Sequence, residues 1–167
     1  MTETGVIRTA YREEYFVYNG LREGEAREYY RDGNLRTLRN YIHGKLDGEY
    51  IFYYEDGVPR IYCHYAMDQL NGVFRDYYCD GNMLTEYYYK AGKLHGCYKT
   101  YFNTGVLKEE GTYCEGELEG CYKAYYQNGQ LSVCSRYKCG MLHGESRSYT
   151  ILGKLENTYY YTSNVKN

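Results

Sequence analysis

One phrase returns along the chain every 24 residues: two aromatic or similar residues, two variable ones, a glycine and an apolar residue two places on. The six copies are YYRDGNL (29–35), YYEDGVP (53–59), YYCDGNM (77–83), YFNTGVL (101–107), YYQNGQL (125–131) and YTILGKL (149–155). The chain therefore divides without a gap into six units, 18–41, 42–65, 66–89, 90–113, 114–137 and 138–161. An unbroken period indicates one supersecondary unit, repeated and stacked on its neighbours.

The turn chemistry predicts what each unit is. Asp-Gly or Asn-Gly between aromatic and β-branched residues favours a two-residue hairpin turn in which both central residues have positive φ. Asp32–Gly33 and Asn128–Gly129 are examples. We therefore expect strand, tight turn, strand, and then a loop such as residues 43–48. Asp68 replaces glycine in one glycine column of that loop, so we expect a different conformation there.

These observations predict an all-β fold, an elongated single-layer antiparallel β-meander built from six 24-residue β-hairpin repeats. Residues 1–167 form a single array in this interpretation. Residues 1–17 are an N-terminal half-repeat cap, because YREEYFV (11–17) is in phase with the second strand of a unit. Residues 18–161 are the six repeats, and 162–167 form a tail.

A two-residue turn also sets the strand register. It places Tyr30 opposite Leu35, Tyr29 opposite Arg36 and Arg27 opposite Leu38, and it puts Pro59 on the same face as Tyr50. Alternation along the strands then gathers aromatic side chains on one face, which is our candidate interaction surface. Its residues are Tyr50, Tyr54, Phe74, Tyr78, Tyr98, Phe102, Tyr122 and Tyr126.

The opposite face carries a basic column, beside a column of tyrosines that begins at Tyr29. Its members are Arg27, Arg75, Lys99, Lys123 and Arg147, with Arg36, Arg60 and Lys108 expected nearby. Such a column could contact anionic lipid headgroups, each cation contributing on the order of 1 kcal/mol. The register also sets Arg75 opposite Glu86 and Lys99 opposite Glu110, so ordinary cross-strand ion pairs are the stronger interpretation.

The stretch AGKLHGCYKTYFNTGVLKEEGTY (91–113) resembles the MORN (membrane occupation and recognition nexus) repeat, in the variant with Tyr-Tyr or Tyr-Phe before the turn glycine. The resemblance extends from Tyr18 to Tyr161. It implies elongated single-layer sheets that act as protein-interaction scaffolds, some of which associate with membranes or bind phosphoinositides. Similar arrays in bacteria include antitoxin-like proteins, and others occur in large DNA viruses, so a virus particle is one implied location.

Several classes of protein are disfavoured by composition. A net charge of -2 argues against nucleic-acid binding. The start of the sequence lacks a secretory signal, and the odd number of cysteines, seven, argues against a disulfide framework. We therefore expect a cytoplasmic or other reducing compartment, with possible peripheral attachment to a membrane.

An enzyme is not expected. A repeating scaffold presents one group many times, whereas catalysis needs one asymmetric set of different groups. None of the four histidines lies beside a recognisable nucleophile, and His95 and His143 share a polar loop position. We expect no catalytic residue, no metal site and no cofactor. Choline- or glucan-binding repeats are a rival interpretation, but those sites use Trp, which this chain lacks.

The sequence thus predicts a non-catalytic protein-interaction or structural scaffold, with lipid binding and antitoxin-like neutralisation as alternatives. The ends of an open sheet are further candidates for pairing with a partner or a second copy. YREEYFV (11–17) is charged, which discourages pairing, whereas LENTYYY (155–161) carries one charge. We therefore expect residues 155–161 to be the pairing edge, with Thr158 and Tyr160 as its test positions.

Overall fold

The computed structural model describes residues 4–8, 12–162 and 165–166. The chain divides into two units, Met1–Gly81 and Asn82–Asn167. The strands of the first unit are β1 (Thr4–Arg8), β2 (Glu13–Tyr18), β3 (Leu21–Tyr29), β4 (Leu35–Ile42), β5 (Lys45–Tyr53), β6 (Pro59–Ala66) and β7 (Gln69–Tyr77).

The second unit repeats the pattern, with two of its strands interrupted. Its strands are β8 (Met83–Lys90), β9 (Lys93–Leu94), β10 (Gly96–Tyr101), β11 (Leu107–Cys114), β12 (Glu117–Leu118), β13 (Gly120–Tyr125), β14 (Leu131–Lys138), β15 (Met141–Tyr149), β16 (Leu155–Thr162) and β17 (Val165–Lys166).

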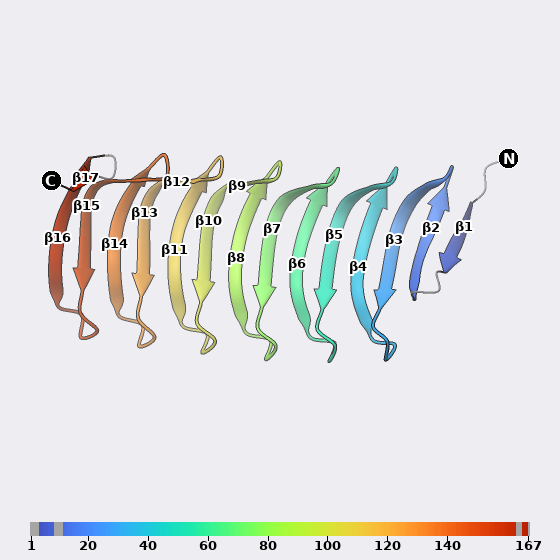
Figure 1. Ribbon diagram of the computed structural model, residues 1–167, viewed down its shortest axis with the longest axis horizontal. Coiled ribbons are helices and arrows are strands. Elements are labelled where there is room, and N and C mark those ends of the chain that lie inside the picture. The colour runs from blue at the N-terminus through green and yellow to red at the C-terminus, as the bar shows by residue number, and fades with distance from the viewer. Residues whose placement is uncertain (1–3, 9–11, 163–164, 167) are drawn as a thin grey trace. The chain divides into compact units, whose positions relative to one another are not determined.

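Within each unit, strands that follow one another in the sequence lie side by side and pair antiparallel (Figure 1). The described residues form strands and turns and no helix. The prediction of an all-β antiparallel meander of hairpin repeats is confirmed. Few of the described residues are buried, as a single layer requires: Ala26, Thr37, Tyr41, Cys63, Tyr98 and Ser135.

The turn that contains the repeated Asp-Gly phrase differs from the prediction. Gly33 has a φ of 97°, but Asp32 is not among the residues with positive φ. The Gly33 amide donates to the Tyr30 carbonyl (3.1 Å), and the Tyr30 amide donates to the Asn34 carbonyl (2.8 Å). These bonds define a three-residue loop, a type I turn followed by a glycine bulge. The expectation of two positive φ values here is wrong.

Asp and Asn precede the turn glycine for a different reason. The Asp32 carboxylate accepts a hydrogen bond from the amide of Asn34 (2.9 Å), and Asp56 does the same for Val58 (3.0 Å). The Asn128 side chain plays this part for Gln130 (3.0 Å). The side chain therefore satisfies the first amide after the glycine, which is the Asx-turn role of these residues.

The two-residue turns with two positive φ values lie at the other end of the hairpins, where a loop was expected. They contain Asn19–Gly20, His43–Gly44, Met67–Asp68, Ala91–Gly92, Glu115–Gly116 and Cys139–Gly140. Asp68 has a φ of 69°, close to the glycines of its column, because Asp tolerates the left-handed region better than most residues. The expectation of a different conformation at Asp68 is wrong.

These short turns are linked to one another between repeats. The Gly44 amide donates to the carbonyl of Arg22 (2.8 Å), and the Asp68 amide donates to that of Leu46 (2.9 Å). In the second unit, the Gly116 amide donates to the Leu94 carbonyl (2.8 Å). The same backbone bond thus joins successive repeats at this edge of each unit.

A bulge interrupts the first strand of each repeat at a second column of glycines, Gly24, Gly48, Gly72, Gly96, Gly120 and Gly144. Arg39 is opposite Tyr50 and Tyr41 is opposite Leu46, so Asn40 alone stands against residues 47–49. Gly48 has a φ of 104° within this bulge, and its Cα hydrogen faces the Asn40 side chain, where an added Cβ would lie 3.4 Å from the Asn40 Cβ. Glycine allows both the positive φ and the close approach of the Asn40 side chain. In two repeats the bulge divides the first strand in two, giving β9 and β10 in one repeat and β12 and β13 in the next.

A second bulge, beside the glycine turn, alters the predicted register. Arg27 is opposite Leu38, as predicted, but Tyr29 is opposite Leu35 and Arg36 is the extra residue. The predicted pairs Tyr30–Leu35 and Tyr29–Arg36 are therefore wrong. Equivalent pairing sets Pro59 opposite Tyr53. Pro59 consequently lies on the face of Tyr53, and its predicted position beside Tyr50 is wrong.

The N-terminal edge also differs from the prediction. β1 pairs antiparallel with β2 along its whole length, from Thr4 opposite Tyr18 to Arg8 opposite Glu14. Residues 14–17 therefore lie between β1 and β3 in the sheet of the first unit, and the idea that YREEYFV forms its edge is wrong. Residue 11 lies outside the described residues. The Arg12 guanidinium donates to the carbonyls of Tyr30 (3.1 Å) and Arg31, which ties the start of β2 to the first glycine turn.

Candidate interaction surfaces

Alternation along the strands gives each unit two different faces. The aromatic face carries the column of Tyr50, Phe74, Tyr98 and Tyr122, together with the column that begins at Tyr41. Ring contacts between the columns show that they share a face: Tyr50 with Tyr65 (centroids 5.8 Å apart) and Tyr122 with Tyr137 (5.8 Å). The basic face carries the column of Arg27, Arg75, Lys99, Lys123 and Arg147 and the column that begins at Tyr29.

Tyr98 is the most enclosed ring of the candidate aromatic residues. It exposes 4% of its surface and stacks on Tyr87, with centroids 5.4 Å apart and planes 6° from parallel. A Cβ at Gly111 would lie 2.8 Å from the ring, so glycine in the opposite strand makes room for it. Tyr98 thus stabilises the sheet, whereas Tyr122 and Phe102 on the same face are half-buried and keep part of their rings accessible.

The remaining candidates lie at the glycine-turn end of the aromatic face. The hydroxyl of Tyr54 donates to the carbonyl of Tyr77 (2.7 Å), and that of Tyr126 donates to the carbonyl of Tyr149 (2.8 Å). Tyr78 belongs to the same column and, like these two, is half-buried. Each hydroxyl bond reaches the next repeat, so these tyrosines connect repeats while their rings stay partly accessible. The sequence shows the column but not these bonds, because they span 23 residues.

The basic column is largely neutralised by carboxylates on its own face. Arg27 pairs with Glu25 (2.6 Å) and Arg147 with Glu145 (2.9 Å). Lys99 is opposite Glu110, as predicted, and Glu110 also forms an ion pair with Lys123 (3.4 Å). The Tyr125 hydroxyl donates a hydrogen bond to Glu110, and this bond lowers the pKa of Glu110. The hydrogen bond and charge of Lys123 lower it further, each by a smaller amount. The face therefore presents paired charges more than a free cationic surface.

Two further arginines lie on the other face from the one expected. Arg36 forms an ion pair with Glu28 (2.6 Å), and its guanidinium lies 5.9 Å from the Phe52 ring centroid. Arg60 lies over the rings of Phe52 (5.7 Å) and Tyr54 (5.6 Å). Both occupy the bulge beside the glycine turn, which turns them onto the aromatic face. The expectation that they extend the basic column is wrong.

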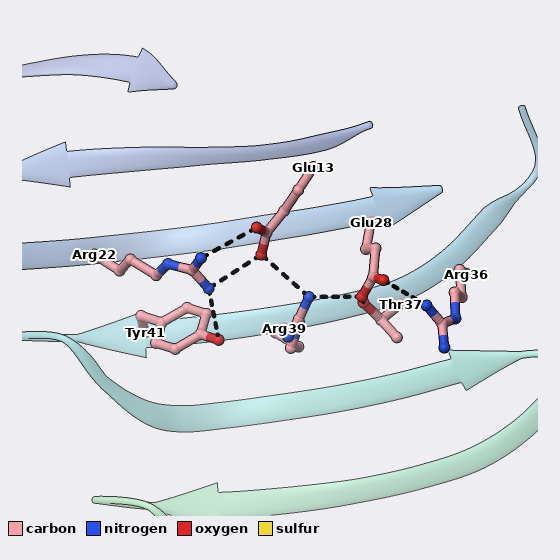
Figure 2. Close-up of polar contacts among 7 residues, drawn as sticks. All are labelled: Glu13, Arg22, Glu28, Arg36, Thr37, Arg39 and Tyr41. Atoms are coloured by element: carbon pink, nitrogen blue, oxygen red, sulfur yellow. Dashed lines mark hydrogen bonds and ion pairs between the residues drawn. The ribbon is translucent and has the colours of Figure 1, made fainter. Parts of the chain in front are cut away.

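The first repeat replaces ring packing on the aromatic face with a network of ions (Figure 2). Glu13 accepts from Arg22 (3.1 Å) and Arg39 (3.3 Å), and Glu28 accepts from Arg39 (3.0 Å) and Arg36 (2.6 Å). The Arg22 guanidinium also reaches the hydroxyl of Tyr41 (3.3 Å). The side chains of Glu13 and Arg39 are each 19% exposed, so these charges depend on one another.

The cause of the network lies in the sequence of the first repeat. Ala26, fully buried, occupies the column of Tyr50 and Tyr98, and Arg22 occupies the column of Leu46. The long arginine side chains occupy the space that rings fill in other repeats, and the Arg22 guanidinium lies 4.2 Å from the Tyr15 centroid. The departures at Ala26, Arg22 and Arg39 were visible in the sequence, but sequence reasoning missed the site.

The candidate edge residues lie at the end of the second unit. Thr158 is opposite Arg147 and Tyr160 is opposite Glu145, whose carboxylate accepts from the Tyr160 hydroxyl (3.2 Å). Tyr160 is 56% exposed. Among the residues that the structure describes, β17 pairs with β16 at Tyr161 and Thr162.

The described residues also show how the cysteines and the metal-ligating side chain types are placed. The seven cysteines are free thiols. In the part of the chain that the structure describes, no group of three His, Cys, Asp or Glu side chains could hold a metal ion. The same residues include no helix that is long and apolar enough to cross a bilayer. What the arrangement offers is two surfaces of rings and paired charges.

Comparison with protein families gives a match over four stretches. The family described as MORN repeat variant matches residues 22–43, 46–66, 94–115 and 118–138, together about half of the chain. Each stretch contains one glycine turn, at Gly33, Gly57, Gly105 or Gly129. No curated protein matches the sequence. The repeated hairpins and this match together place the chain in the MORN repeat family.

Proposed function

We propose that this chain is a non-catalytic binding module for a protein partner, and that the partner contacts the aromatic face. MORN repeats form interaction modules for proteins or membranes and are generally not enzymes. The observation that carries the proposal is the row of half-buried rings that successive repeats present, with no second layer over it among the described residues of each unit. Accessible aromatic side chains are enriched at protein interfaces.

The distribution of charge favours this face over the other for a protein partner. On the basic face, three of the five cations are held by carboxylates within 3.4 Å. A partner on the basic face would have to compete with those ion pairs. A partner on the aromatic face would remove apolar ring surface from water, which is favourable. Tyr and Phe are also among the residues that interfaces use as anchors.

Site-specific photo-cross-linking tests the proposal. A photoreactive phenylalanine analogue at Phe102, on the aromatic face, is compared with the same analogue at Lys99, on the basic face of the same hairpin. In a lysate of the source cells we expect a discrete cross-linked protein from position 102 and none from position 99. A cross-link from position 99 alone would assign the contact to the basic face.

Binding of the captured partner is then measured with two matched variants of neighbouring residues. Tyr122→Ser removes a ring from the aromatic face, and the chain tolerates serine there because Ser146 occupies the same column. Lys123→Ser changes the opposite face. We expect Tyr122→Ser to weaken binding roughly tenfold and Lys123→Ser to leave it within about twofold. A larger loss of partner binding with Lys123→Ser than with Tyr122→Ser would contradict the proposal. Binding of the chain to anionic vesicles that Lys123→Ser abolishes and Tyr122→Ser does not would favour lipid and contradict it too.

A further inference from the structure

A hollow of about 370 Å³ opens on the basic face of the first unit, over β5, β6 and β7. Tyr53 and Tyr77 stand on its two sides, two strands apart and therefore about 10 Å from each other. Pro59 lies between them, directly opposite Tyr53. Ile51 and Arg75 each stand opposite Tyr62, which lies between them. We call this site the Pro59 hollow.

Three of its lining residues depart from the columns to which they belong. The column of Pro59 otherwise contains Leu35, Met83, Leu107, Leu131 and Leu155. The column of Ile51 otherwise contains Arg27, Arg75, Lys99, Lys123 and Arg147. The column of Tyr62 otherwise contains Leu38, Glu86, Glu110, Cys134 and Thr158. The other repeats fold with those residues, so the hairpin does not require the three departures, yet all three line one hollow.

Each departure makes the site better at holding an apolar group. Pro59 has a shorter side chain than Leu or Met, which leaves space between Tyr53 and Tyr77. Ile51 puts an apolar side chain where the other repeats have Arg or Lys. An apolar ligand can therefore bind beside it without removing water from a cation, which would cost free energy. Tyr62 adds a third ring, and its hydroxyl donates to Glu49 (2.9 Å) while its ring meets that of His64 edge-on (centroids 5.3 Å apart). The ring is therefore held in place before any ligand arrives.

The hollow is also asymmetric in charge. Arg75 is its one charged residue among the described side chains that line it. A guanidinium prefers a carboxylate or phosphate, which it can contact through two parallel hydrogen bonds. A hollow of this size, with ring and aliphatic walls and a single charged group to orient the ligand, is typical of specific binding sites.

We propose that the Pro59 hollow binds a peptide segment that inserts one aromatic or leucine side chain between Tyr53 and Tyr77 and places an adjacent carboxylate on Arg75. A peptide fits better than a nucleic acid, because nucleic-acid affinity comes from several phosphate contacts and the hollow has one cation. This site lies on the face opposite the one proposed for the main partner. It would therefore add a second, sequence-selective contact.

The test uses the full chain and three fluorescent peptides, Gly-Ser-Phe-Glu-Ser-Gly, the same peptide with Gln for Glu, and the same peptide with Ser for Phe. Binding is followed by NMR shifts of the Tyr53 and Tyr77 ring protons. We expect the Phe-Glu peptide to bind most tightly and the Ser-Glu peptide to show no saturable shift. Replacing Glu by Gln should weaken binding several-fold.

The decisive variant is Pro59→Leu, which installs the residue that four other repeats carry and so fills the hollow without unfolding the hairpin. We expect it to weaken the Phe-Glu peptide at least about tenfold. Leu35→Met, in the same column one repeat away, is the matched control and should bind as the unmodified chain does. Arg75→Gln should remove the preference for Glu over Gln while keeping binding of the aromatic side chain.

Three outcomes would overturn the proposal. The first is equal binding to the chain with Pro59→Leu, and the second is the absence of saturable binding at millimolar peptide. The third is binding of oligo-dT that Pro59→Leu abolishes, which would assign the hollow to nucleic acid. The aromatic-face variant Tyr122→Ser lies in the other unit and should leave peptide binding unchanged, so failure of one proposal is distinguishable from failure of the other.

Discussion

Tyrosine supplies much of the ring surface that this sheet buries, and it brings an ionisable hydroxyl to every place where it packs. Burial raises the pKa of Tyr122 to about 12, and it raises that of Tyr98 further. Burial also raises the pKa of Cys63 to about 12. All these groups pack in their neutral form, so the protein depends on their remaining protonated.

We therefore predict that alkaline pH destabilises the protein. In the unfolded chain tyrosine ionises near pH 10. A group whose pKa is raised in the folded state contributes its stability below the unfolded value and loses it as pH rises towards the folded value. The free energy of unfolding, measured with urea, should fall between about pH 10 and pH 12. Tyr122→Phe keeps the ring contact with Tyr137 and should reduce that fall, because Phe cannot ionise. An identical pH dependence in the two proteins would contradict this account.

The single positive φ in each glycine turn allows a sharp test at the scale of one element. Gly57 has a φ of 86°, which a β-branched residue adopts only at a cost of about 1–3 kcal/mol. Gly57→Val should therefore lower the free energy of unfolding by that amount. Glu55→Val introduces the same side chain in the same turn at a residue without positive φ, and it should have little effect. Equal losses in the two variants would mean that the turn geometry is wrong.

The C-terminal strand gives a second prediction for an element. Among the described residues β17 pairs with β16 at Tyr161 and Thr162, and we propose that residues 155–161 act as the pairing edge. Lysine at both Thr158 and Tyr160 should weaken self-association or partner pairing there, because charged edges resist strand addition. Analytical ultracentrifugation reports association, and circular dichroism confirms that the repeats stay folded. If the double variant associates as the unmodified chain does, binding does not use this edge.

The repeats, the strand direction and the two faces could be predicted from the sequence because the 24-residue period and the alternation of side chains determine them. The turn types could not. Asp-Gly is compatible with a two-residue turn and with a three-residue loop, and the choice depends on bonds such as that from Tyr30 to Asn34. That choice created a bulge at Arg36, which moved Arg36 and Pro59 to the faces opposite those predicted.

Part of each candidate site could likewise be predicted from the sequence, and part could not. The aromatic column of Tyr50 follows from alternation alone, whereas the burial of Tyr98 depends on Gly111 in the neighbouring strand. The ion network of the first repeat requires Glu13, from the strand before the repeat, to meet Arg39 across β3. Sequence columns compare equivalent positions, so they do not show contacts between different columns.

For the molecule as a whole, the contacts follow the order of the chain. Within each unit a strand contacts the strands next to it in sequence, and the same backbone bonds join each repeat to the next. Stability in such arrays is approximately a sum over repeats and their nearest-neighbour interfaces. A local defect should therefore have a local effect.

Hydrogen exchange tests this expectation. Gly120→Val places a β-branched residue at a φ of 81° in the fifth repeat. We expect lost amide protection in β13 and β14, a smaller loss in β11 and β15, and unchanged protection in β3 to β5. Cys121→Val, at the next residue and without positive φ, is the control. A uniform loss along the chain would show one cooperative unit and contradict the nearest-neighbour description.

The bond from Gly44 to Arg22, repeated from Gly116 to Leu94, has a genetic consequence. Because the junctions that this bond makes within each unit share one geometry, recombination between two repeats of the same unit would add or remove a whole repeat while those junctions still fit. The residues that set the Pro59 hollow apart, Ile51, Pro59 and Tyr62, all lie within the single repeat 42–65. One exchange would therefore copy or delete the proposed peptide site as a block, and the neighbouring hairpins would keep their register.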